Sequence, residues 1–413
     1  MLMVASMGRG SRKRVNIDEV TCCRLDGYCG STMQFVRSYM PLDSYRHVAR
    51  EIAHAFALAT CFGLRECIAV QSCDVCRAVY ELSESLPHLG EVSSFCLTLA
   101  QLLANAVEEF LELSYARCGY GYHRDPVKAL TDFLHSRELR EWLVQAARSC
   151  MKFSRICGLP PIRVARRVKR SARVLNVEAL EMAARIATEV ISAAGLSGEI
   201  ASITRTSDVE RAMPHEVALG LVMVVAKAMS RDLAAWERRG VSHRLYILLD
   251  SSGSMYMGQR AVAATALALA LAAVVLYARG EVYARAFSGD TLPPPMHPPA
   301  FGAEQVLDLI ASVVPSYETA IMHALRVALR DLAERSPATI VVVTDGECLV
   351  DPSIGVEARR MGVKICAAVC GNPNPNLFEA ARRSGGFAYI IEPSPKHVKT
   401  FVLRAVREVL WSR

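Results

Sequence analysis

The pattern of hydrophobic and polar positions changes character near Gly240. Before this point, apolar residues recur every three or four positions, which is the spacing of one face of an α-helix. Glycine and proline residues separate these stretches. The pattern predicts helices over residues 47–62, 74–86, 91–116, 126–147, 176–194 and 215–238.

After Gly240, short apolar runs alternate with helical stretches. The predicted strands are 244–249, 281–287, 339–344, 363–369 and 387–391. The predicted helices are 258–279, 302–313, 319–335, 353–361, 376–384 and 395–411. Alternating strands and helices predict a mostly parallel sheet with helices on both faces. The runs LYILL and IVVV have the continuous apolar character of strands that are buried on both faces.

These patterns predict an all-α N-terminal domain, residues 17–239, followed by an α/β domain, residues 240–413. Residues 1–16 are polar and basic and are expected to form a flexible tail. Residues 261–278 carry no charge and are long enough to cross a membrane. Their high alanine content and the flanking Arg260 and Arg279 favour a helix buried under the sheet, so no membrane span is expected.

The composition is that of a globular protein, with 52% hydrophobic and 22% charged residues among 413. The net charge of +7 permits an acidic partner surface without requiring nucleic acid. The start of the chain lacks the apolar core of a secretory signal, and many of the 14 cysteines lie in apolar stretches. We therefore expect a cytoplasmic protein with reduced thiols; disulfides are the alternative for a hyperthermophilic source.

One cysteine pair, Cys73 and Cys76, has the spacing of a metal or redox site. No second pair follows at a matching distance, so buried thiols are the favoured interpretation.

Two aspartates follow buried strands. Asp250 ends the first strand in LYILLDSSGSM, and Asp345 ends another in TIVVVTDGE. Ligands of an open α/β sheet bind at the carboxyl ends of its strands, and two carboxylates there repel each other unless a cation lies between them. The hydroxyls of Ser252 and Ser254 can face the same point from a tight loop. Oxygen ligands alone favour Mg²⁺, with Mn²⁺ or Ca²⁺ as alternatives.

Together, D-x-S-x-S after one buried strand, a threonine that opens a later helix, and T-D-G after another strand resemble the metal-ion-dependent adhesion site of von Willebrand factor A domains. The resemblance implies a Rossmann-like α/β fold and a site whose metal is completed by an Asp or Glu of a protein partner. The family often has glycine before the threonine, where this chain has Glu318. The resemblance assigns the metal ligands to Asp250, Ser252, Ser254, Thr319 and Asp345.

The run GEIASITRTSDVERAMPHEVALGL, residues 198–221, is similar to the region before the A domain in intracellular ViaA and CoxE-like proteins. Those proteins are partners of MoxR-type AAA+ ATPases. The similarity implies an adaptor for such an ATPase in protein remodelling or metal-centre assembly. A helix capped by Ser207 or Asp208, followed by Pro214 at a first helical turn, explains the same residues without that function.

The competing hypothesis is an enzyme, a metal-dependent phosphohydrolase that uses Asp250. A haloacid dehalogenase-type phosphatase needs a second aspartate two residues on as its acid and base, and that position holds Ser252. A serine hydrolase needs G-x-S-x-G and a late histidine, and the chain offers only His397 near its end. Catalysis is therefore not expected.

A third hypothesis is a nucleic-acid-associated factor that uses the run RVARRVKRSARV, residues 163–174. As one helix, this run would place its arginines on one basic face. No aromatic residues are interleaved with them, so we expect a face that is solvated, paired with carboxylates or docked on an acidic partner.

Overall fold

The computed structural model describes most of the chain after residue 41. The described residues are 42–61, 74–86, 93–117, 126–170, 176–194, 199–202, 234–237, 244–256, 259–288, 299–313 and 320–411. Contacts divide the chain into two compact units, Met1–Glu141, here the helical unit, and Trp142–Arg413, here the sheet unit. The predicted domain boundaries after residues 16 and 239 remain predictions, and residues 1–16 lie outside the described part of the chain.

The helical unit is built from amphipathic helices. They are α2 (Leu42–Cys61), α4 (Asp74–Ser85), α5 (Ser93–Arg117), α6 (Pro126–His135) and the start of α7 (Arg137–Cys157). Helix α2 packs against α4 and α5, and α4 packs against α6. Phe56 and Leu102 are fully buried, and the ring of Phe110 stacks on that of Phe133 at 4.3 Å between centroids.

One predicted helix, 126–147, is two helices. The break falls at Ser136, whose hydroxyl oxygen accepts a hydrogen bond from the Leu139 N–H at 3.3 Å. A serine in this position caps the first turn of a new helix, so α7 starts at Arg137 rather than continuing α6.

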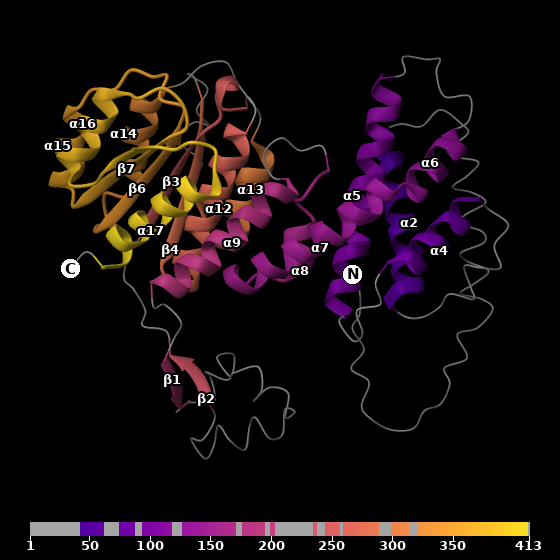
Figure 1. The fold of residues 1–413 in the computed structure, drawn as a ribbon. Coiled ribbons are helices and arrows are strands. Elements are labelled where there is room, and N and C mark those ends of the chain that lie inside the picture. The colour runs from indigo at the N-terminus through magenta and orange to yellow at the C-terminus, as the bar shows by residue number, and fades with distance from the viewer. Residues whose placement is uncertain are drawn as a thin grey trace. The chain divides into compact units, whose positions relative to one another are not determined.

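The sheet unit contains a six-stranded sheet with helices on both faces (Figure 1). Its strands are β3 (Arg244–Asp250), β4 (Glu281–Phe287), β5 (Ala300–Phe301), β6 (Ala338–Thr344), β7 (Val363–Val369) and β8 (Ala388–Ile390). Their order is β5-β4-β3-β6-β7-β8, and every pair is parallel except β4 with β5. The predicted mostly parallel α/β sheet is therefore confirmed.

The helices of the sheet unit cover it in two layers. They are α12 (Arg260–Tyr277), α13 (Gly302–Ser312), α14 (Ile321–Asp331), α15 (Ser353–Arg360), α16 (Pro375–Ser384) and α17 (Pro395–Trp411), with the 3-10 turn η2 (Gly253–Tyr256). One layer, α14 to α16, shares a buried cluster with Tyr246, Leu248 and Ile340. Helices α12, α13 and α17 also contact the sheet but contribute no residues to this cluster. Helix α12 contacts β3, β4 and β6.

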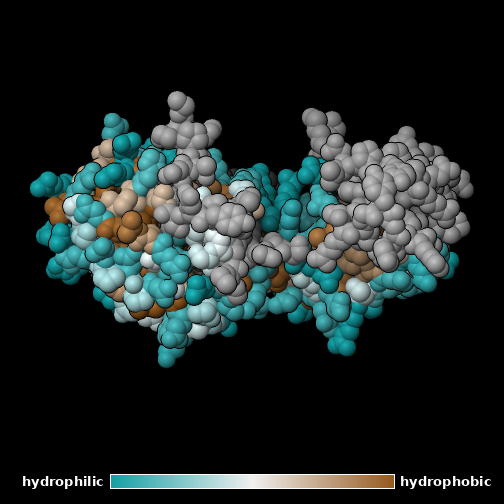
Figure 2. Space-filling view, turned by 90° about the horizontal axis from the view of Figure 1, so that it is seen from above, coloured by the Kyte–Doolittle hydropathy of each residue, from teal (hydrophilic) through white to brown (hydrophobic). Residues whose placement is uncertain are grey.

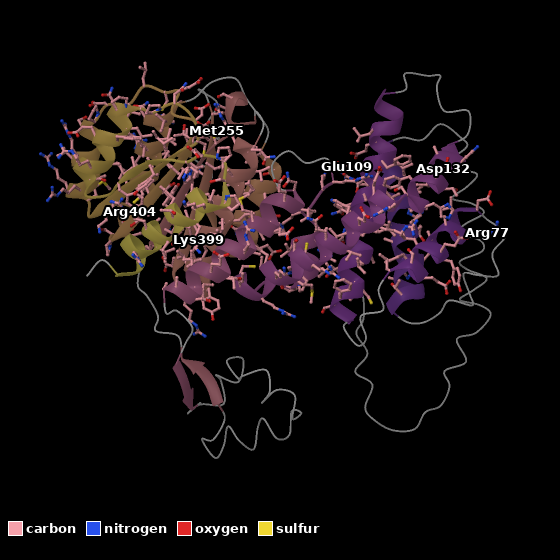
Figure 3. All side chains as sticks on the ribbon, in the orientation of Figure 1. Arg77, Glu109, Asp132, Met255, Lys399 and Arg404 are labelled. Atoms are coloured by element: carbon pink, nitrogen blue, oxygen red, sulfur yellow. The ribbon has the colours of Figure 1, made fainter. Side chains whose placement is uncertain are left out.

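Helix α12 is buried nearly all round. Every residue from Ala261 to Val275 is buried, which confirms the predicted helix under the sheet. By length and composition it is the one helix in the described part that could span a membrane, and 83% of it is buried in the protein. Its outer side packs along α9 (Val177–Ala193), a helix that precedes the sheet in sequence. Helix α9 also contacts α17, where Lys399 (labelled in Figure 3) pairs with Glu189 at 2.5 Å.

The N-terminal region is mostly helical, as predicted, but not all-α. Strands β1 (Glu199–Ser202) and β2 (Ala234–Glu237) form an antiparallel pair. The helix predicted over 215–238 is therefore wrong at residues 234–237, and residues 203–233 lie outside the described part. The local pattern of this segment favours a helix, but pairing with a strand more than thirty residues away decides its structure.

The basic run also differs from its prediction of one helix over 163–174. Helix α8 spans only Pro161–Ala165, and turns follow at Arg166 and Arg167. Val168 is fully buried after these turns. Residues 171–175 lie outside the described part.

One alternative predicted for this basic run was pairing with carboxylates, and two of its arginines pair in this way. Arg163 and Arg167 both contact Glu304, and Arg167 also contacts Asp308, on α13 of the same unit.

Candidate metal centre

The two aspartates predicted as metal ligands lie on neighbouring strands. Strands β3 and β6 are adjacent and parallel, with Leu249 opposite Val343. Asp250 is the last residue of β3, and Asp345 follows the last residue of β6. Both side chains are therefore at the carboxyl-end edge of the sheet, and both residues are buried, at 2% and 0% exposure.

The carboxylate of Asp250 is held at both oxygens. Its Oδ1 accepts the Ser252 N–H at 2.8 Å, and its Oδ2 accepts the Thr344 hydroxyl at 2.6 Å. Burial raises the pKa of Asp250 to about 6, and the negative charge of Asp345 adds to the rise. The hydrogen bonds from Thr344 and Ser252 oppose it by stabilising the ionised form.

The carboxylate of Asp345 is satisfied at one oxygen only. Its Oδ1 accepts the Glu347 N–H at 3.0 Å. Its Oδ2 is buried and has no hydrogen-bond partner. A buried charged oxygen without a partner is costly, and a cation is the partner that removes both this cost and the repulsion from Asp250.

Two hydroxyls complete the described oxygens of the site. The Oγ atoms of Ser252 and Ser254 lie 3.2 Å apart. The loop is fixed from both sides: the N–H and hydroxyl of Ser251 both donate to the Phe287 carbonyl, and the N–H of Met255 (labelled in Figure 3) donates to the Ser252 carbonyl. Two carboxylates and two hydroxyls are hard oxygen donors that suit Mg²⁺.

Thr319 and Glu318 lie outside the described residues. The next residue, Ala320, donates its N–H to the Ser288 carbonyl at 3.1 Å, just beyond the end of β4. The chain therefore enters α14 from the same edge of the sheet that carries Asp250.

The loop after β6, which carries Asp345, packs closely against the loop after β7. Gly346 has a φ of +88°, and a Cβ there would lie 2.1 Å from the Asn372 carbonyl oxygen. A Cβ on Gly371 would lie 2.5 Å from the Asp345 carbonyl oxygen. The loops after β6 and β7 can pack this closely only because glycine occupies both positions.

Comparison with known proteins identifies this part of the chain. Residues 245–347 match the family model of the von Willebrand factor type A domain. The match begins in β3 and ends two residues after Asp345, so it contains both aspartates. The sheet unit thus contains a von Willebrand factor type A domain.

Among solved structures, the chain is similar to the conserved hypothetical protein BatB from Bacteroides thetaiotaomicron. The two are 20% identical, and the alignment covers 40% of this chain and 97% of that one, with a TM-score of 0.33. No curated protein matches the chain.

Two residues that support the A-domain site were missed by the sequence analysis. Thr344 donates to Asp250, and Asn374 donates from Nδ2 to the carbonyls of Gly346 and Cys348 at 3.0 and 2.7 Å. Asn374 also caps α16 by accepting the Leu377 N–H at 3.0 Å. The sequence signal that could have predicted the role of Asn374 is an asparagine directly before a proline at the start of a helix.

The cysteines of the described part show no second metal site. Cys150, Cys366 and Cys370 are buried free thiols. No group of three or more His, Cys, Asp or Glu side chains in the described ranges is placed to hold a metal. Cys73 lies outside those ranges, so the interpretation of Cys73 and Cys76 as buried thiols rather than a metal or redox pair remains a prediction.

Replacing Asp250 by asparagine is expected to stabilise the metal-free protein above pH 6. The raised pKa means that folding favours the neutral carboxyl, so this stabilisation is complete below the ordinary pKa of 3.8 and is lost as the pH rises through about 6. At about 1.4 kcal/mol for each unit of pKa, the loss is on the order of 3 kcal/mol. Asparagine stays neutral, and the Thr344 hydroxyl can turn to accept from its amide.

Urea unfolding in a chelator at pH 4.5 and pH 8 measures this effect. The difference between Asp250→Asn and wild type should favour the variant by only about 1 kcal/mol at pH 4.5 and by about 3 kcal/mol at pH 8. Glu347→Gln, on an exposed residue of the same region, is the control and should show no such difference. A variant that is less stable than wild type at pH 8 would contradict the assignment.

Proposed function

We propose that the A-domain edge is a metal-ion-dependent adhesion site that binds Mg²⁺, with Mn²⁺ or Ca²⁺ as alternatives. Asp250, Ser252, Ser254, Thr319 and Asp345 would hold the ion. The observation that supports this most directly is the buried Oδ2 of Asp345, which lacks a partner beside a second buried carboxylate. The ion would neutralise the two aspartates and offer a position to a carboxylate of a partner protein.

The residues of this chain would prepare that contact. The Thr344 hydroxyl and the Ser252 N–H orient the carboxylate of Asp250. The Glu347 N–H occupies only one oxygen of Asp345 and leaves the other free. Because these donors are fixed before a partner arrives, little conformational order has to be gained on binding.

We propose binding rather than catalysis. The position two residues after Asp250 is Ser252, whose hydroxyl contacts Ser254 and which cannot serve as the acid and base of a phosphatase. The nucleic-acid hypothesis is weakened because Arg163 and Arg167 are paired with carboxylates of α13. The alternative is a phosphohydrolase that uses Asp250, which would turn over a phosphate ester.

The proposed partner is a MoxR-type AAA+ ATPase, and the proposed role is that of a cytoplasmic adaptor in protein remodelling or metal-centre assembly. The support is the similarity of residues 198–221 to the segment before the A domain in ViaA and CoxE-like proteins. An Asp or Glu of the ATPase would reach the metal site.

Isothermal titration of the full chain with MgCl₂ tests the metal site. Wild type is expected to bind one ion per chain, and Asp345→Ala is expected to lose binding because it removes a charged ligand. Glu347→Gln should bind as wild type does. The fold of Asp345→Ala is checked by thermal melting in chelator, where loss of the buried unpartnered oxygen should offset loss of the Glu347 hydrogen bond and leave the protein folded.

Pull-down of the organism's MoxR-type ATPase, with and without chelator, tests the partnership. Wild type should retain the ATPase only when Mg²⁺ is present, and Asp345→Ala should not retain it. Retention that ignores both chelator and Asp345→Ala would contradict the mechanism. Turnover of a generic phosphate ester that disappears in Asp250→Asn would replace the adaptor by the hydrolase.

A further inference from the structure

One large apolar side chain beside the metal site is almost completely exposed. Leu349 is 91% exposed, whereas the next most exposed large hydrophobic residue in the described part, Phe301, is 50% exposed. The face of the sheet unit that Figure 2 shows is mainly hydrophilic, with apolar patches between the hydrophilic areas. A single exposed leucine is common on protein surfaces, but Leu349 differs in that the backbone on both sides of it is held in place.

The backbone before Leu349 is held rigidly. The side-chain amide of Asn374 donates one hydrogen to the Gly346 carbonyl and one to the Cys348 carbonyl. Asn374 is itself 8% exposed and fixed at the start of α16. The Cys348 N–H also donates to the Gly346 carbonyl at 2.9 Å, which closes a tight turn just before Leu349.

The backbone after Leu349 is held as well. Val350 is 6% exposed and belongs to the core cluster under α14 to α16. Asp351 accepts both the N–H and the hydroxyl of Ser353 at the start of α15, at 2.9 and 2.6 Å. Leu349 therefore cannot fold back without breaking contacts on either side, and the loop keeps this apolar side chain in solvent.

Leu349 also lies close in sequence to the proposed metal ligand Asp345. The N–H of Glu347 donates to Asp345, and Leu349 is two residues further on. The four residues from Asp345 to Leu349 span at most about 14 Å, which is inside the footprint of one protein–protein contact. The residues on either side of this position, Glu347 and Asp351, are exposed carboxylates.

We propose that Leu349 is the apolar anchor of the same interface, and that it inserts into an apolar pocket of the partner protein. This proposal rests on the proposed function of the metal site. The flanking carboxylates indicate a partner pocket with a basic rim, close to the acidic residue that reaches the metal. A few side chains that fill pockets of the partner carry most of the binding energy of an interface, so one such anchor can be measured by truncation.

The size of the effect follows from burial. Transfer of a whole leucine side chain from water into an apolar pocket contributes about 1.5–3 kcal/mol. Because the loop is already ordered in the free protein, binding loses little conformational entropy there. Leu349→Ala should therefore raise the Kd for the partner about 10- to 100-fold.

Fluorescence anisotropy of the labelled MoxR-type ATPase, titrated with the full chain in Mg²⁺, tests the anchor. We expect Leu349→Ala to bind 10- to 100-fold more weakly, Leu349→Met to bind nearly as wild type, and Ile390→Ala to be unchanged as an exposed apolar control on β8. Mg²⁺ affinity and the melting temperature of Leu349→Ala should equal those of wild type.

The outcomes separate this proposal from the proposed function. If chelator and Asp345→Ala abolish binding while Leu349→Ala does not weaken it, the anchor is wrong and the metal site stands. If wild type does not bind, or binds without metal, both proposals fail. Loss of Mg²⁺ affinity in Leu349→Ala, or a change in self-association by light scattering without a change in ATPase binding, would also overturn the anchor.

Discussion

Replacing Asp331 by alanine is expected to lower the free energy of unfolding by about 3–5 kcal/mol. Asp331 on α14 accepts the guanidinium of Arg285 at 2.8 and 3.2 Å, and it also accepts the Tyr246 hydroxyl. The Arg285 side chain on β4 is only 4% exposed, and its other described hydrogen bond is to the Tyr246 oxygen at 2.9 Å. Without Asp331, a buried positive charge would be left facing a neutral phenol.

Urea unfolding of Asp331→Ala, followed by circular dichroism, measures this loss. The control is Glu379→Ala, which removes two exposed ion pairs to Arg382 and Arg383 and should unfold at nearly the same urea concentration as wild type, because solvent screens these charges. A double variant with Arg285→Met and Asp331→Leu should recover most of the stability, because it removes the charge together with its partner. A loss below 1 kcal/mol in Asp331→Ala would show that the buried network is not as described.

This network also matters for the candidate site. Asp331 lies at the end of α14, and the start of α14 follows Thr319, a proposed metal ligand. The contacts to Tyr246 and Arg285 fix α14 against β3 and β4, and β3 ends at Asp250.

A chain that begins at Gly240 is expected to be unfolded or insoluble, whereas one that begins at Arg137 should fold. The shorter chain lacks α9, which packs along the outer side of α12. The α9 residues Leu180, Ile186 and Val190 are buried, and each large aliphatic side chain contributes up to about 1.5–3 kcal/mol. The sum, on the order of 5 kcal/mol, is comparable to the whole stability of many domains.

Soluble expression, size-exclusion chromatography and thermal melting of the two chains test this dependence. A full-length Lys399→Ala variant, which removes only the exposed ion pair between α17 and α9, is the control and should melt within a few degrees of wild type. A soluble, monomeric chain from Gly240 with the melting temperature of the longer one would show that α9 is not needed.

The strands of the sheet and the positions of Asp250, Ser252, Ser254 and Asp345 at its carboxyl edge could be predicted because they depend on local signals. A continuous apolar run defines a buried strand, and the first polar residue after it lies at the strand end. The motif spacing then restricts the chemistry to oxygen ligands. Prediction failed where a distant partner outweighs the local signal. The sequence of β2 favours a helix, but β2 pairs with β1 as a strand.

Local sequence patterns are enough to predict the elements of the α/β domain and the chemical type of its site. Long-range packing makes β3 and β6 neighbours, which brings Asp250 and Thr344, 94 residues apart, into contact beside Asp345. It also decided that α9 covers α12 and that Asn374 holds the loop of Leu349. Hydrophobic periodicity records which face of an element is buried, but the partner of that face depends on long-range packing, which no local pattern specifies.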